Sequence, residues 1–297
     1  MLLVPVILWA FLAQGGECRL VLSRAQAAYQ ERRYADAIGG FRQAIVACPD
    51  DQPLLLPLAQ AQLMAQRLED SRETLETMLL GQPLNLDGLK LLGDVEYLLG
   101  REAEAQAALL RALRIDPLHK PSLYALGRVY YQQNRIDDSL ALFLKLTAED
   151  ARDFRAHDNL ALCYAALQRD TDAVRHFMKA LDLVYKAHPE YDVVYANFAN
   201  FLLDRSQFEQ AFQLAATAAE RNPNSARNFF LTGKALVKLE KLELSVRWLK
   251  EAGALDPSYT EPHYWLAQVY RKLGRRDEAK RELEIFRELS KAPKMKR

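Results

Sequence analysis

Residues 120–153 read KPSLYALGRVYYQQNRIDDSLALFLKLTAEDARD, and their apolar residues fall into two stretches with helical spacing. A polar segment from Gln132 to Asn134 separates the two stretches. The residues that recur at steps of three and four positions are Leu123, Leu126, Gly127 and Tyr130, followed by Leu140, Phe143 and Leu146. Because residues three and four apart share one face of an α-helix, this segment predicts two helices joined by a short turn.

Prolines indicate that this helical hairpin is repeated along the chain. They lie 34 residues apart in two series, Pro49, Pro83 and Pro117, then Pro189, Pro223 and Pro257. A fixed period of this length is typical of repeat proteins. Aligned on the prolines, residues 18–293 divide into eight windows: 18–51, 52–85, 86–119, 120–153, 154–191, 192–225, 226–259 and 260–293. The fifth window has 38 residues, and we expect the additional ones, around Val184 to His188, to lengthen its second helix by about one turn.

The windows resemble the tetratricopeptide repeat, whose pattern is Trp-x-x-Leu-Gly-x-x-Tyr, then Ala-x-x-x-Phe, then Pro. The match is strongest at Leu126-Gly127-x-x-Tyr130 with Phe143, at Leu160-Ala161-x-x-Tyr164 with Ala173 and Phe177, and at Leu266-Ala267-x-x-Tyr270 with Ala279. It is weakest in the second window, and the fourth has Ala151 where proline is expected. The resemblance implies an all-α, right-handed superhelical solenoid of about eight helix-turn-helix repeats, with the first helices lining its concave side.

Composition and motifs argue against several classes of function. The 297 residues are 50% hydrophobic and contain 40 Lys and Arg against 39 Asp and Glu, so no net charge attracts nucleic acid. The three cysteines form no C-x-x-C pair and the five histidines no H-E-x-x-H motif, so we expect no metal site and no cofactor. No phosphate-binding loop, nucleophile elbow or paired carboxylate motif is present, and the repeat tyrosines are expected in the core. We therefore expect that the chain is not an enzyme.

The N-terminal segment predicts export. Residues 1–13 read MLLVPVILWAFLA, an apolar run of the length of a signal-peptide core and too short to span a bilayer. We expect residues 1–16 to be a signal peptide cleaved after Gly15 or Gly16, which gives a periplasmic or secreted protein with no membrane insertion of the mature chain. No Lys or Arg precedes Arg19, so the alternative of an uncleaved apolar segment docked on the first repeat, in a cytoplasmic protein, stays open. Residues 294–297 form a short basic tail.

The family resemblance also implies which side chains face the concave groove. These are the second, fifth, sixth, ninth and twelfth positions of the first helices, and the candidate peptide-binding residues there are Tyr124, Arg128, Tyr131, Arg155, Asn159, Asn197, Asn200, Arg227, Phe230, Lys234, Tyr264 and Gln268. These candidates come from the fourth to eighth windows, and Asp158 in the fifth window belongs to the same set as its one acid. Asparagine can donate to and accept from a peptide bond at once.

Two asparagines of this set occupy equivalent positions in adjacent windows. Asn159 and Asn197 resemble two rungs of the asparagine ladder in the repeats of O-linked N-acetylglucosamine transferases. The alternative is that both are solvated or bond neighbouring helices. The carboxylate clamp of repeats that bind chaperone C-termini is not intact, because Lys90 stands alone and Arg155 with Asn159 lacks partners in the preceding window. Chaperone docking is therefore not predicted.

Together these patterns predict a non-enzymatic scaffold that binds an extended peptide or a partner protein in its concave groove. Two alternatives stay open: a structural subunit of an envelope assembly, and a substrate-recruiting accessory of a separate enzyme. Cys18 and Cys48 lie at the two ends of one predicted antiparallel hairpin, so a disulfide can join them if the chain is exported, with two unpaired thiols as the alternative. Cys163 is expected to stay reduced on the packed side of its helix.

Overall fold

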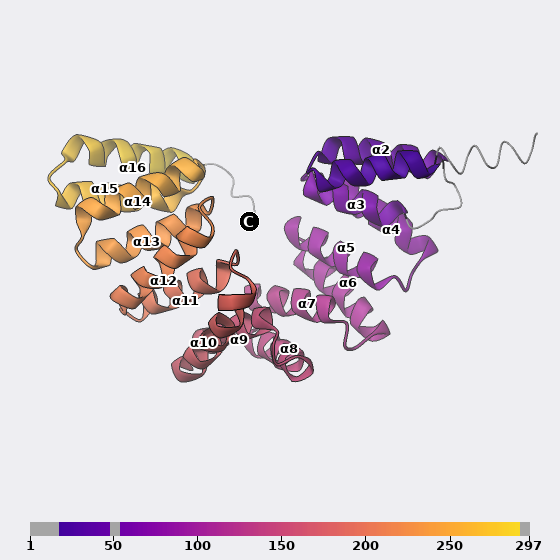
Figure 1. Cartoon of the computed structure of the whole chain (residues 1–297), viewed down its shortest axis with the longest axis horizontal. Coiled ribbons are helices and arrows are strands. Elements are labelled where there is room, and N and C mark those ends of the chain that lie inside the picture. Colours follow the sequence, from indigo (N-terminus) through magenta and orange to yellow (C-terminus); the bar gives the residue numbers. More distant parts are fainter. Residues whose placement is uncertain (1–17, 48–53, 292–297) are drawn as a thin grey trace, which may run out of the picture. The chain divides into compact units, whose positions relative to one another are not determined.

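The computed structural model describes residues 18–47 and 54–291, which are all-α (Figure 1). The predicted signal peptide, the basic tail and Cys48 lie outside the described residues. Sixteen helices and no strands occur within the described part, which confirms the predicted fold class. No helix among the described residues combines the length and the apolar content that a membrane span requires.

The chain divides into two compact units, with the first ending at Asn134 and the second beginning at Arg135. The first unit contains a helix over residues 18–30 and then α2 (Tyr34–Ala47), α3 (Leu55–Met64), α4 (Leu68–Gly81), α5 (Leu86–Leu98), α6 (Glu102–Ile115) and α7 (Lys120–Gln132). The division falls between the two helices of the fourth window, so α7 belongs to unit one and α8 to unit two.

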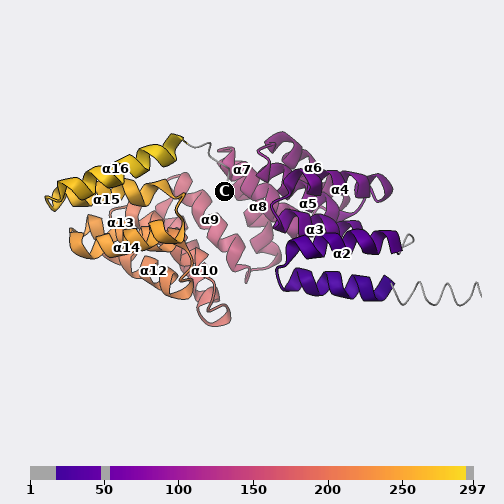
Figure 2. The same cartoon turned by 90° about the horizontal axis from the view of Figure 1, so that it is seen from above.

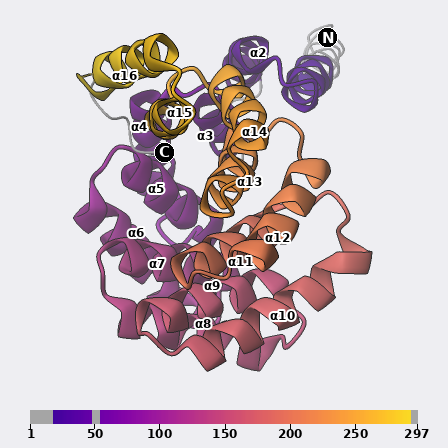
Figure 3. The same ribbon diagram turned by 90° about the vertical axis from the view of Figure 1, so that its left-hand side faces the viewer.

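The second unit contains the remaining helices as successive hairpins. They are α8 (Ile136–Glu149), α9 (Phe154–Ala166), α10 (Asp170–Ala187), α11 (Val193–Asp204), α12 (Phe208–Arg221), α13 (Ala226–Lys238), α14 (Leu242–Leu255), α15 (Thr260–Lys272) and α16 (Arg276–Lys291). Figures 2 and 3 show α13 beside α14, and α15 beside α16. As expected from the longer fifth window, α10 has 18 residues whereas α8 and α12 have 14.

Each hairpin turns at a residue in the left-handed backbone region. Among the described residues eight have a positive φ, between 57° and 78°: Arg32, Gln66, Gly100, Asn134, Gln168, Ser206, Glu240 and Gly274. In seven of these turns the next residue donates its N–H to the carbonyl five residues back, as where Arg169 N–H donates to the Tyr164 carbonyl at 2.9 Å. Every hairpin therefore uses the same backbone solution at the same place in its window.

Small residues let the paired helices approach closely. A methyl group built at Gly93 would lie 2.6 Å from Cγ of Leu109, and one built at Gly233 would lie 2.7 Å from Cγ of Leu249. Aromatic rings fill the wider gaps, for example between α10 and α11, where the rings of Phe177 and Phe198 stack with centroids 4.8 Å apart. The predicted core tyrosines, Tyr130, Tyr164 and Tyr270, are all buried.

Candidate binding surfaces

Three successive first helices of unit two are joined by hydrogen-bonded polar side chains. Asp158 on α9 accepts a hydrogen bond at Oδ2 from Nδ2 of Asn197 on α11, at 2.8 Å. Asn197 in turn accepts at Oδ1 from Nη2 of Arg227 on α13, also at 2.8 Å. We call these three residues the α9–α11–α13 relay. The relay connects a buried carboxyl group to an exposed guanidinium group across three repeats.

The inner end of the relay is almost removed from solvent. Asp158 is 3% exposed, and its Oδ1 is buried without a hydrogen-bond partner among the described residues. Burial disfavours the ionised carboxylate and raises the pKa of Asp158 to about 7, against the opposing effects of the Asn197 hydrogen bond and the Arg227 charge. The carboxyl group can therefore gain or lose a proton near neutral pH.

The two asparagines of the expected ladder make different contacts. Asn159 donates from Nδ2 to the carbonyl of Arg155 on its own helix, at 2.8 Å. Asn197 is buried and uses both ends of its amide within the relay. Asn197 thus bonds neighbouring helices, as the alternative interpretation held, and it is the direct hydrogen-bond partner of Arg227.

The other predicted groove residues of unit two divide into exposed and packed side chains. Arg155 is exposed, and its guanidinium lies over the rings of Phe154 and Tyr191, at 5.4 and 5.9 Å from their centroids. Phe230 is only 7% exposed and packs edge-on against Tyr259, with the ring centroids 5.2 Å apart, so it belongs to the core. The structure therefore corrects the prediction that Phe230 is open to a ligand.

The remaining members lie on α11, α13 and α15. Nδ2 of Asn200 lies 3.5 Å from Oδ2 of Asp204 on its own helix. Lys234 and Gln268 are half-buried. Tyr264 is 42% exposed and lies against the ring of Phe286, with centroids 5.5 Å apart. Arg155, Arg227, Lys234 and Tyr264 therefore remain available at the surface of unit two.

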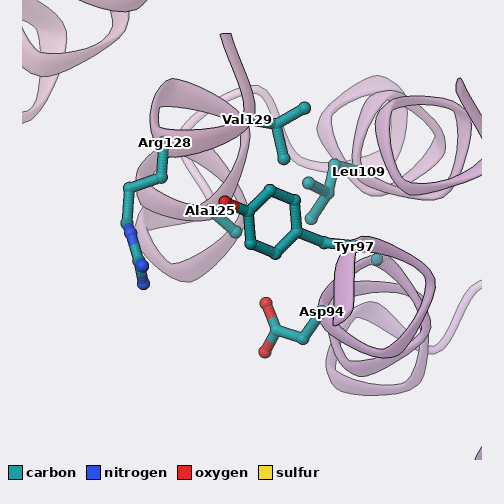
Figure 4. Close-up of a pocket in the computed structure, with 7 residues that line it drawn as sticks. Asp94, Tyr97, Leu109, Ala125, Arg128 and Val129 are labelled. Carbon is teal, nitrogen blue, oxygen red and sulfur yellow. The ribbon is translucent and has the colours of Figure 1, made fainter. Parts of the chain in front are cut away.

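In unit one, Arg128 lies at a small cavity between α5, α6 and α7 (Figure 4). The cavity has a volume of about 30 Å³ and is lined by Gly93, Asp94, Tyr97, Leu109, Ala125, Arg128 and Val129. Asp94 accepts a hydrogen bond from Nζ of Lys90 at 2.5 Å. Burial raises the pKa of Asp94, and the charge of Lys90 opposes that effect.

Asp94 and Tyr97 at this cavity were not among the predicted site residues. They occupy the ninth and twelfth positions of the third window, whereas the predicted groove residues lie in the fourth to eighth windows. Tyr124 and Tyr131, predicted on the same helix as Arg128, are half-buried. Applying the family positions to every window would have found both missed residues.

The cysteines and histidines form no cluster suited to a metal ion within the described ranges. Cys48 lies outside the described residues, so the disulfide between Cys18 and Cys48 stays a prediction. Cys163 is free and buried beside Ser139, with Sγ and Oγ 3.3 Å apart. Burial raises the pKa of the Cys163 thiol to about 11, against the effect of the Ser139 hydrogen bond. Cys163 is therefore a packed core residue and not a reactive thiol.

Models of the tetratricopeptide repeat match residues 56–119, 124–191 and 263–290, and a TPR repeat model matches residues 233–274. Over 159 residues the chain is 30% identical to the human Protein O-mannosyl-transferase TMTC3, which covers 50% of this chain and 17% of that protein. The mouse protein of the same name is 30% identical over 153 residues, which covers 48% of this chain and 16% of that protein. The chain thus spans about a sixth of the length of these relatives.

Solved repeat proteins share the fold. A tetratricopeptide repeat protein from Parabacteroides merdae has a TM-score of 0.69 at 16% identity, with 91% of this chain and 98% of that chain covered. Yeast Tom70 has a TM-score of 0.65 at 18% identity, with 88% and 57% covered. The matched family models extend over more than half of the sequence and agree with the helical hairpins of the structure. The chain therefore belongs to the tetratricopeptide repeat family.

Proposed function

We propose that the chain is a non-enzymatic scaffold that binds an extended peptide or a partner protein along the first helices of unit two. The observation that supports this most directly is the α9–α11–α13 relay, in which the guanidinium of Arg227 donates a hydrogen bond to Asn197 and Asn197 donates one to Asp158. A preorganised charged donor loses little conformational entropy when it binds a ligand. Packing of the repeats alone does not require such a chain of polar groups.

The surface proposed for the ligand is positively charged. Arg155 and Arg227 are exposed, Lys234 is half-buried, and Asp158 is the acid beneath them. Guanidinium groups bind carboxylates and carbonyl oxygens through directed hydrogen bonds. A peptide that carries carboxylates or presents its backbone carbonyls therefore fits this surface.

The test compares two triple variants that remove the same charge from different faces. The partner is first captured by affinity purification of the full chain and identified by mass spectrometry. The variant Arg155→Ala, Arg227→Ala, Lys234→Ala is then compared with Arg175→Ala, Lys179→Ala, Arg247→Ala. The control residues are exposed on the second helices α10 and α14.

We expect the first variant to weaken partner binding more than tenfold, since each lost charge-assisted hydrogen bond contributes about 1.5–3 kcal/mol. The control variant should bind within about twofold of the wild type, because exposed charges far from an interface act weakly through solvent. Both should keep the helical circular dichroism signal. Equal affinities of the two variants would refute the proposal.

A substrate-recruiting accessory of an enzyme is a second candidate. Half of this chain resembles part of a protein named as an O-mannosyl-transferase, which supports a role beside a catalytic partner. In that case the captured complex should contain glycosyl transfer activity. A captured complex without a transferase subunit would count against this candidate and leave the scaffold proposal intact.

We also propose that the chain is exported through residues 1–16. The proposal is supported by the sequence, in which an apolar run is followed by small residues. The segment lies outside the described residues.

A further inference from the structure

Asp158 is an unusual carboxylic acid, because its side chain is buried and only one of its two oxygens is hydrogen-bonded. Oδ2 accepts from Asn197, whereas Oδ1 has no partner among the described residues. A buried polar atom without a partner is costly and calls for an explanation. Oδ1 is the oxygen that can take up a proton without breaking the relay.

The protonation state of Asp158 changes the electrostatic environment of Arg227. When Asp158 is ionised, its negative charge partly balances the positive charge of the Arg227 guanidinium. The amide of Asn197 links the two groups, because it donates to Asp158 and accepts from Arg227. When Asp158 is neutral, the charge of Arg227 has no such counterpart. An anionic ligand therefore binds Arg227 more tightly when Asp158 is protonated, because no carboxylate then competes for the guanidinium charge.

We propose that Asp158 is a proton-linked positioning residue, so that a carboxylate of the ligand bound at Arg227 and a proton bound at Asp158 favour each other through Asn197. This inference rests on the function proposed above and specifies its ligand as an acidic peptide. Linkage is reciprocal, so binding of the peptide raises the pKa of Asp158, and a lower pH raises the affinity for the peptide.

Other groups near Asp158 do not take over this role. Asn197 on α11 and Arg227 on α13 are the neighbours that act on its ionisation. Arg155 lies one turn earlier on α9 and faces Phe154 and Tyr191. His157 on α9 contacts α10 instead, where its Nδ1 lies 3.0 Å from Nδ1 of His176. Burial lowers the pKa of His176, and the charge of His157 adds to this effect, so the experiment must separate histidine titration from Asp158.

The experiment measures binding of a defined probe to the full chain between about pH 6 and about pH 8, at constant low ionic strength. The probe is an acetylated and amidated peptide of alternating Ala and Glu, and its control is the same peptide with Gln in place of Glu. The glutamates stay ionised throughout this range, so the charge of the probe is constant. Calorimetry in two buffers of different ionisation enthalpy gives the protons taken up on binding.

For the wild type we expect affinity for the Glu peptide about tenfold higher at the lower pH, a coupling of about 1.4 kcal/mol, with net proton uptake. Asp158→Asn is nearly isosteric and always neutral, so it should bind at every pH with the affinity that the wild type has at low pH. Arg227→Gln should bind weakly at every pH. The Asp158→Asn variant keeps all histidines, so its loss of pH dependence identifies Asp158.

The inference is overturned if Asp158→Asn retains the pH dependence of the wild type, if no proton is taken up, or if the Glu peptide does not bind at the lower pH. A second readout does not depend on any variant: the titration midpoint of the Asp158 carboxyl carbon, followed by NMR, should rise when the Glu peptide is added. If the Gln peptide binds as well as the Glu peptide and the Arg155, Arg227 and Lys234 variant weakens both, the scaffold function stands and the inference fails.

Discussion

Substituting alanine at two glycines of the seventh hairpin should have opposite effects on stability. Gly233 lies on α13, and a methyl group there would be 2.7 Å from Cγ, 2.8 Å from Cδ2 and 3.3 Å from the backbone nitrogen of Leu249. Gly253 lies on α14, and a methyl group there would be 3.4 Å from ring atoms of His263, an ordinary contact. Leu249 is fully buried, so it has little freedom to move away.

The magnitudes follow from two opposing effects. Replacing glycine by alanine inside a helix stabilises by about 0.5–1 kcal/mol, because the unfolded chain loses conformational freedom. Forcing a methyl group into a packed site costs about 1–3 kcal/mol. We therefore expect Gly233→Ala to lower the free energy of unfolding by about 1–2 kcal/mol and Gly253→Ala to raise it by about 0.5–1 kcal/mol.

Urea unfolding followed by circular dichroism measures both variants, and hydrogen exchange of α13 and α14 localises the change, since repeat arrays can open in parts. The variant Leu249→Ala supplies the test of mechanism. It removes the crowded side-chain atoms, so Gly233→Ala in that background should no longer destabilise, with a coupling of about 1–3 kcal/mol. If Gly233→Ala stabilises the wild-type protein as much as Gly253→Ala does, the close-approach argument is refuted.

Three other predictions concern titration, oxidation and export. Burial raises the pKa of Asp158 to about 7 in the folded chain, so the folded state binds this proton more tightly than the unfolded state. The contribution of Asp158 to stability therefore decreases from about pH 4 to about pH 7, by up to about 1.4 kcal/mol per pH unit. Urea midpoints of Asp158→Asn should lack this slope, and an unchanged slope would contradict the assignment. Denatured but unreduced protein should contain one reactive thiol, Cys163, if Cys18 and Cys48 are bonded, whereas three thiols would exclude the bond. A reporter that is active only outside the cytoplasm should be active when fused to residues 1–25, and mature protein that retains its initiating methionine would contradict export.

The sequence predicts the helical hairpins well because their determinants are local. The spacing of Leu123, Leu126 and Tyr130 defines one face of one helix, and the following polar residues mark the turn. These signals do not depend on distant parts of the chain. The division between Asn134 and Arg135 was not predicted, because it depends on contacts across the whole array.

The role of Asn197 was not predicted because it depends on two residues 39 and 30 positions away, Asp158 and Arg227. Asn159 has the same position in its window, but the following window offers Val193 where Asn197 meets Arg227. Equal positions in a repeat therefore do not imply equal contacts. The sequence contains the signal, but only when neighbouring windows are compared position by position.

Phe230 illustrates the same point for an apolar side chain. Its position in the first helix predicts exposure in the groove, yet Tyr259, at the last position of the same window, covers it. The family positions describe an average repeat. A large residue in the loop before the next helix changes which side chains a ligand can reach.

The eight left-handed turns are places where the stability of single hairpins can be changed. Six of them are occupied by residues other than glycine, among them Gln168 and Glu240, for which this backbone region is strained by about 1 kcal/mol or more. Each turn lies outside the core and outside the candidate binding surface. Because each repeat of such an array interacts chiefly with its neighbours, a glycine at one turn would strengthen one hairpin and leave distant ones unchanged. The stability of each hairpin can thus change separately, through substitutions at turns that do not contact the candidate binding surface.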